Sequence, residues 1–162
     1  MARTLATLAI LIGSCGPPAG ADGGAGCGTG PGTVEVGAGG SRLRALSERG
    51  GELSIIRGAQ GGIHVVVGAW VADMDLELEL RYRLTDAGTP VGDETVRDLA
   101  PGLFAPDGDR WVRHPDLVVL DDDEPRVDDF AGRRLTLEVE ARSVDGSHAC
   151  DRREVTLVDP DA

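Results

Sequence analysis

The chain has 162 residues and a formal net charge of −12 at pH 7, with 28 acidic residues, sixteen arginines and no lysine. Such an acidic chain, with its positive charges scattered, is a poor candidate for nucleic-acid binding, which needs concentrated positive charge. We also expect anionic lipid headgroups to repel it unless divalent cations intervene. Its length is typical of one domain that can bury a sizeable core.

The first fourteen residues have the layout of an export signal. Arg3 supplies one positive charge, residues 5–12 form a short apolar core, and small residues follow. As a helix, such a core spans about 12 Å, far less than the roughly 30 Å hydrocarbon core of a bilayer. The sequence therefore predicts that residues 1–14 are a signal peptide that is removed, and not a retained transmembrane anchor.

Residues 11–15, Leu-Ile-Gly-Ser-Cys, resemble the lipobox of bacterial lipoproteins. The resemblance implies that Cys15 receives a diacylglycerol thioether and becomes the mature N-terminus, so that acyl chains hold the protein at its membrane. Gly16 follows Cys15 where Asp would favour the inner membrane in familiar Gram-negative lipoproteins, which implies the outer membrane. The alternative is cleavage by the ordinary signal peptidase near Ala21, which would release a soluble secreted protein.

Cysteine number points to the same compartment. Apart from Cys15 the chain has two cysteines, Cys27 and Cys150, and an even pair in an exported protein predicts one disulfide. Closing a loop of this length stabilises the fold by about 4 to 5 kcal/mol in the chain-entropy model. Two unpaired thiols are the alternative. The three histidines share no ligand spacing with each other or with a CxxC pair, so we predict neither a metal site nor a cofactor.

Composition divides the chain after the signal. Residues 16–40 contain eleven glycines and almost no large apolar side chain, which is typical of a flexible tether. We predict a lipidated cysteine and tether at 15–32, a folded domain at 33–159 and a short tail at 160–162.

Period-two alternation of apolar and polar residues predicts the fold of that domain. It is clearest at residues 76–84 and 135–142, the latter leading into Asp145-Gly146, a favoured hairpin turn pair, and a returning strand around Val155 and Leu157. Shorter candidate strands are 33–36, 42–46, 53–57, 63–71, 95–99 and 117–120. The sequence predicts an all-β fold, a single antiparallel β-sandwich of seven to nine strands. In strand number and alternation it resembles immunoglobulin-like or fibronectin-like modules; a small barrel is the alternative.

Two loops carry candidate ligand-binding residues. Residues 58–64 hold several glycines with Gln60 and His64, which could contact a ligand, although a tight turn between strands explains the same residues. Asp121, Asp123 and Asp128 belong to an acidic segment whose oxygens could bind calcium, but EF-hand spacing is missing and solvated loop charge is the simpler interpretation.

Trp111 lies in a polar stretch, where it could stack against a sugar ring or pack as a plug on the core. Sequence motifs of common hydrolases, zinc proteases and nucleotide-binding enzymes are missing, although a hydrolase with carboxylates brought together by folding stays open. We therefore expect a non-catalytic envelope lipoprotein that acts as a structural or interaction module. Its expected partners are the membrane, through the lipid, and an envelope protein or polysaccharide. A calcium- or glycan-binding adhesion module is the alternative.

Overall fold

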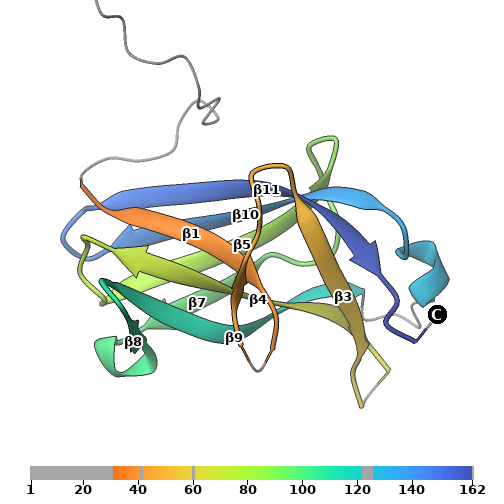
Figure 1. Ribbon diagram of the computed structural model, residues 1–162, viewed down its shortest axis with the longest axis horizontal. Coiled ribbons are helices and arrows are strands. Elements are labelled where there is room, and N and C mark those ends of the chain that lie inside the picture. The colour runs from red at the N-terminus through yellow and green to blue at the C-terminus, as the bar shows by residue number, and fades with distance from the viewer. Residues whose placement is uncertain (1–30, 41, 60, 122–125, 162) are drawn as a thin grey trace, which may run out of the picture.

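The computed structural model describes residues 31–40, 42–59, 61–121 and 126–161 (Figure 1). Their regular structure consists of eleven strands and two short 3₁₀ turns, without an α-helix. The strands are β1 (Thr33–Ala38), β2 (Arg44–Ala45), β3 (Gly51–Arg57), β4 (Ile63–Ala72), β5 (Leu78–Asp86), β6 (Thr89–Pro90), β7 (Thr95–Leu99), β8 (Ala105–Asp107), β9 (Arg110–Asp121), β10 (Arg134–Ser143) and β11 (His148–Val158). The turns are η1 (Pro101–Leu103) and η2 (Val127–Asp129). Within this part of the chain, no helix has the length and apolarity needed to span a bilayer.

The structure confirms the predicted all-β sandwich. Each of the nine segments predicted from alternation contains a strand, and the short strands β6 and β8 bring the number to eleven. Strand β9 begins at Arg110, well before the predicted start at Leu117. The prediction missed this first half because Arg113 and Asp116, two of its inward-facing residues, are charged.

Sheet A contains β11, β10, β5 and β7 side by side. The short strand β6 pairs with the last residues of β5, on the same side of β5 as β7. Sheet B has β4 at its centre, β9 along one side and β1 along the other, while β2 and β8 add to its margins. These pairs are all antiparallel.

Strand β3 belongs to both sheets. Its first half, from Gly51 to Ser54, pairs parallel with β11 of sheet A, and its second half, from Ile55 to Arg57, pairs antiparallel with β4 of sheet B. In Figure 1, β3 accordingly runs obliquely between the two layers. The parallel pair departs from the predicted purely antiparallel sandwich, and the eleven strands form one mixed sheet that folds over itself without closing.

The core fills the space between the two layers. Alternate residues of the long strands point inward, as the period-two pattern predicted, and the largest of them are almost completely buried: Tyr82, Leu53, Ile55, Ile63, Leu80, Leu84, Leu135, Leu137 and Leu157. At about 25 cal/mol per Å² of apolar surface removed from water, this interior is the main stabilising term of the fold.

A bulge in β9 determines which of its residues face the core. On β4, Val67 and Ala69 are two residues apart, but their partners on β9, Asp116 and Arg113, are three apart. The extra residue lies where the His114–Pro115 peptide is cis, opposite Gly68. Because of the bulge, Asp116 and Arg113 both face the core, on the same side of the sheet as Val67 and Ala69.

Candidate functional site

A polar cluster interrupts the core where β5 and β7 of sheet A approach β9 of sheet B. The Tyr82 hydroxyl donates a 3.1 Å hydrogen bond to Oδ2 of Asp116, and the guanidinium of Arg113 donates a 3.2 Å bond to Oδ1. Nε of Arg97 lies 3.6 Å from the same Oδ1. The Thr95 hydroxyl donates a 2.9 Å bond to a carbonyl of β9. Together these contacts fasten one edge of the sandwich.

The chemistry of this cluster is structural. Tyr82 is fully buried and Asp116 is 2 % exposed. Burial raises the pKa of Tyr82 well above its ordinary value, and the negative charge and hydrogen bond of Asp116 raise it further. The phenol therefore stays protonated and acts as a donor. With a donor at each of its oxygens, the buried Asp116 compensates the nearby arginines.

The outer face of sheet A, formed by the outward side chains of β5, β7, β10 and β11, is covered by ion pairs. Arg83 contacts Glu94 and also lies 3.7 Å from Glu138, which in turn accepts a 2.7 Å bond from Arg152. Arg81 pairs with Glu94 at 3.1 Å. Opposite charges alternate across neighbouring strands, which favours the observed register.

Glu140 is the most enclosed carboxylate on this face, at 9 % exposure. Its Oε1 accepts 3.0 and 2.7 Å bonds from Arg142 and lies 2.6 Å from Nε2 of His148. Desolvation, the largest single effect, raises the pKa of Glu140, but the hydrogen bonds and charges of Arg142 and His148 together outweigh it and the net pKa is lowered. Cys150 is the cross-strand partner of Glu140 and is disulfide-bonded.

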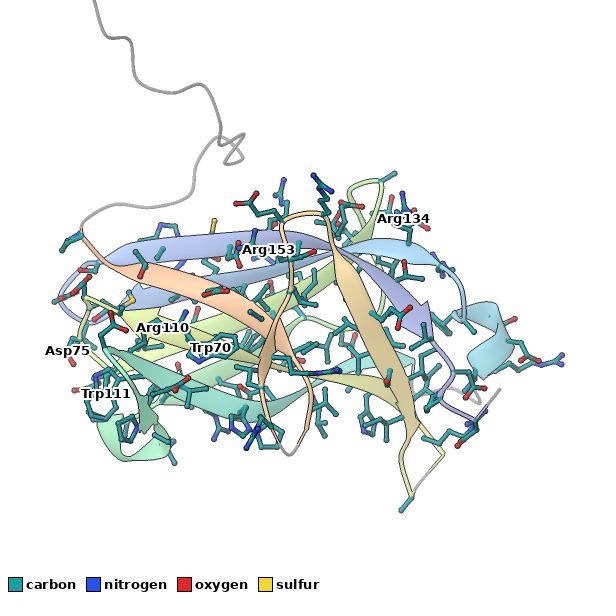
Figure 2. All side chains as sticks on the ribbon, viewed as in Figure 1. Trp70, Asp75, Arg110, Trp111, Arg134 and Arg153 are labelled. Atoms are coloured by element: carbon teal, nitrogen blue, oxygen red, sulfur yellow. The ribbon has the colours of Figure 1, made fainter. Side chains whose placement is uncertain are left out.

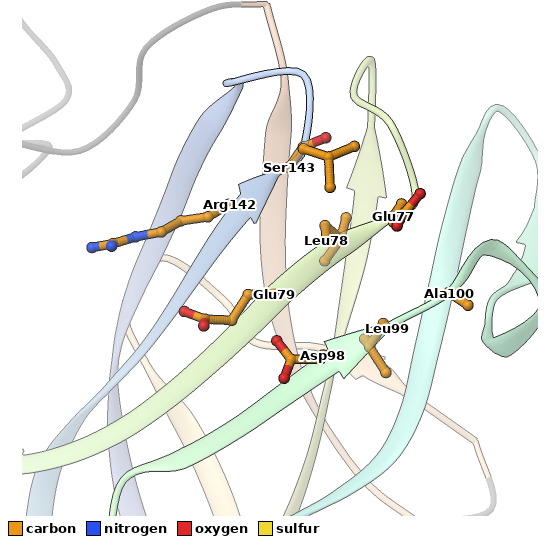
Figure 3. A pocket seen from close by; sticks show the side chains of 9 residues that line it. Glu77, Leu78, Glu79, Asp98, Leu99, Ala100, Arg142 and Ser143 are labelled. Atoms are coloured by element: carbon orange, nitrogen blue, oxygen red, sulfur yellow. The ribbon is translucent and has the colours of Figure 1, made fainter.

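A shallow hollow of about 430 Å³ lies at the end of sheet A where β5, β7 and β10 meet (Figure 3). Its apolar part includes the buried Leu78 and Leu99 and the exposed Val144. Its polar side chains are Glu77, Glu79, Asp98, Arg142 and Ser143. Three carboxylates, those of Glu77, Glu79 and Asp98, against the single guanidinium of Arg142 suit a cationic group.

Two carboxylates lie side by side in the hollow. Glu79 on β5 and Asp98 on β7 are direct cross-strand partners, an arrangement in which like charges destabilise the sheet. Glu79 is paired with Arg81 at 2.8 Å, whereas Asp98 has no ion pair with another described residue. Arg142 is bound to Glu140, and in Figure 3 its guanidinium points away from Asp98. The hollow therefore keeps an uncompensated negative charge.

The candidate residues predicted from sequence do not come together in one site. Trp111 lies at the beginning of β9 with 41 % of its surface exposed (Figure 2), and Asp121 is the last residue of the same strand. His64 is half-buried on β4, and Asp128 is exposed on η2. A hollow of about 510 Å³ brings Asp128 near the glycines of residues 58–61, so the two predicted loops are neighbours at one end of the molecule, away from Trp111.

Four of the residues selected from the sequence cannot be placed. Gln60, Asp123, Cys15 and Cys27 lie outside the described residues, so the pairing of Cys27 with Cys150 stays a prediction. Among the described residues no group of three or more His, Cys, Asp or Glu side chains is placed to hold a metal ion.

No known family model, curated protein or solved structure matches this chain. The functional interpretation therefore depends on the chain's own residues. Sequence reasoning missed Asp98 and the Tyr82–Asp116 pair, because the first needs the register between β5 and β7 and the second needs the packing of the two sheets. The isolated polar end of Tyr82, on an otherwise apolar strand face, was the available signal, since a buried phenol usually has a hydrogen-bond partner.

Proposed function

We propose that this protein is an exported, lipid-anchored β-sandwich that serves as a non-catalytic structural or interaction module of the bacterial cell envelope, at the outer membrane. The observation that carries the proposal is the disulfide at Cys150. Structural disulfides persist in oxidising compartments outside the cytoplasm, which agrees with the signal-like segment and the lipobox-like residues 11–15.

The arrangement of charges supports an interaction role over catalysis. Glu140 and Asp116, the two most enclosed carboxylates of the described residues, are both occupied by cationic or hydroxyl donors. A general acid or base needs a free proton-transfer position facing a substrate. The shallow hollow at the end of β5 and β7 offers a surface for contact instead.

The decisive experiment is intact-mass analysis of the full chain purified from bacterial membranes, with and without reduction and alkylation. We expect a diacylated or triacylated N-terminus at Cys15, and alkylation of Cys27 and Cys150 only after reduction. Cys15→Ser is the matched control, and it should move the protein out of the membrane fraction. A chain that keeps Met1 and free thiols would show that the export proposal is wrong, and an unmodified chain starting near Asp22 would show a secreted protein.

Carbohydrate binding is the second candidate, because Trp111 presents 41 % of its surface on a polar part of the molecule. Exposed tryptophan can stack on a sugar ring. A glycan array probed with the wild-type protein and Trp111→Ala tests this function, which requires binding by the first and loss of binding by the second. Calcium binding by the acidic segment is tested by titration, since a bound ion would raise the melting temperature at millimolar calcium.

A further inference from the structure

Strand β7 has a free edge. Among the described residues it pairs only with β5, through a register that includes Tyr82 opposite Thr95 and Leu80 opposite Arg97. The Leu84 carbonyl accepts a bond from an amide on the β6 side of β5, so the even-numbered residues of β5 direct their backbone groups toward β6 and β7. Their partners in β7 must therefore point back at β5.

It follows that Val96 and Asp98, which alternate with those partners, direct their N–H and C=O groups away from the sheet. Neither makes a backbone hydrogen bond beyond β5 with another described residue. The Val96 carbonyl accepts only a 3.2 Å bond from the guanidinium of its neighbour Arg97. A strand edge of this kind is a template for pairing with another chain.

Two other edges carry additional bonds to their backbone. On β9, the Val119 carbonyl accepts a 3.1 Å bond from the amide of Asp93. On β1, the amide of Val36 donates a 2.9 Å bond to the carboxylate of Asp151. The backbone of β7 receives no such bond from a distant described residue.

The hollow includes residues 98–100, at and just after the end of β7, and indicates the chemistry of an added strand. Asp98 lines it next to Glu79, and both carboxylates lie on the outward face of the sheet, whereas their neighbours Leu78 and Leu99 are buried on the inner face. A residue opposite Asp98 on an added strand would share its face of the sheet. An Arg or Lys there would place its charge near both carboxylates, on the outward face of the sheet.

We propose that β7 accepts an extended segment of a partner protein as a further strand of sheet A, with a basic side chain of that segment held over Glu79 and Asp98 in the hollow. Backbone hydrogen bonds to Val96 and Asp98 supply affinity, and the carboxylates select a basic sequence. The net charge of −12 favours the approach of such a segment. The inference rests on the proposed interaction role and gives that role a surface.

The test uses the full chain and labelled peptides of about eight residues, the usual length of a strand. One peptide alternates valine and arginine, a second carries N-methyl groups on the backbone amides of one edge, and a third has glutamate in place of arginine. We expect saturable binding of the first by fluorescence anisotropy, with the second and third at least about tenfold weaker because they lose the backbone bonds or the charge attraction.

Variants locate the binding site. Val96→Pro removes an edge amide that takes no part in the pairing with β5, so it is compatible with folding and should weaken binding at least about tenfold. Asp98→Asn should weaken binding about three- to fivefold, as expected for an exposed ion pair. Asp109→Asn, which removes an equal charge from the turn between β8 and β9, should leave it unchanged.

Three outcomes would overturn the inference: no binding of the arginine peptide at millimolar concentration, equal binding of the N-methylated peptide, or equal losses from Asp98→Asn and Asp109→Asn. Self-association through the same edge, shown by sedimentation of the wild type but not of Val96→Pro, would assign the edge to a second copy and also overturn it. Peptide binding does not depend on acylation of Cys15, so this inference and the lipoprotein proposal can fail separately.

Discussion

The guanidinium carbon of Arg110 lies 4.9 Å from the centroid of the Trp70 ring, on the outer side of sheet B (Figure 2). The indole Nε1 of Trp70 donates a 2.6 Å hydrogen bond to Asp107, and Arg110 also contacts Glu35. These partners leave Trp70 only 6 % exposed although it points away from the main core. Trp70 thus forms a small second cluster on the outside of the sandwich.

The two tryptophans should differ in their contribution to stability. Trp70→Ala should lower the free energy of unfolding by about 3 to 5 kcal/mol, as for other buried tryptophans. Trp111→Ala should cost only about 1 to 2 kcal/mol, because Trp111 already has much of its apolar surface in water. Urea denaturation measures both, and equal losses would contradict the assignment of Trp111 as an exposed residue.

Tyr82→Phe should destabilise the fold by about 1 to 3 kcal/mol, since it removes the hydroxyl that donates to Asp116 and leaves that buried oxygen without this partner. Thermal or urea unfolding at neutral pH checks the value. Thr85→Ser, a polar change on the half-buried side of the same strand, is the control and should have little effect.

Tyr82 also predicts a dependence of stability on alkaline pH. Its pKa is raised in the folded state, so its contribution is complete below the unfolded pKa of about 10 and is lost as pH rises from there toward the folded-state value. The chain has a single tyrosine, so the near-ultraviolet absorbance of tyrosinate follows this group alone. Ionisation at the ordinary pKa in the folded protein would contradict the buried hydrogen bond.

Glu140 predicts that stability falls in acidic solution, whereas Tyr82 predicts a fall in alkaline solution. Its folded pKa is lowered below 4.5 by Arg142 and His148 acting against desolvation, so its contribution is present above that value and is lost as pH falls through the folded pKa. Glu140→Gln should therefore reduce the difference in unfolding free energy between neutral and acidic solution. Glu52→Gln, at an exposed position of β3, should leave that difference unchanged.

Gly68→Ala should be strongly destabilising. An added Cβ would lie 2.5 Å from the carbonyl oxygen of Arg113 and 2.7 Å from Cβ of His114, at the bulge in β9. Overpacking of this kind costs about 1 to 3 kcal/mol. Gly102→Ala is the matched control, because an added Cβ there meets nothing within 4 Å. Similar melting temperatures for the two variants would contradict the close approach of β4 and β9.

Local alternation was enough to predict most of the strands because one face of each is buried and the other is in water. Leu78, Leu80, Tyr82 and Leu84 follow that rule. The first half of β9 does not follow it, because Asp116 is charged and yet buried. Its partners are Tyr82, which is distant in the sequence, and Arg113, which lies on the other side of the bulge. The parallel pairing of β3 with β11 was equally unpredictable, because alternation specifies which face of a strand is buried but not its neighbour.

The candidate site was harder to predict than the fold for a related reason. Asp98 lies in a short segment with an ordinary strand pattern, and its closeness to Glu79 follows only from the register between β7 and β5. Trp111 and Asp128 could be selected from the sequence by residue type. An unpaired charge can be recognised only when the ion pairs of the neighbouring side chains are known from the structure.

Because β3 is hydrogen-bonded to β11 along its first half and to β4 along its second, the two layers are joined by backbone as well as by side-chain packing. The layers cannot slide or separate on that side without breaking main-chain bonds. A mechanical load entering through β1, which also pairs with β4, would pass through β4 and β3 into β11. A pull on the N-terminal end of the domain would thus be shared by both layers.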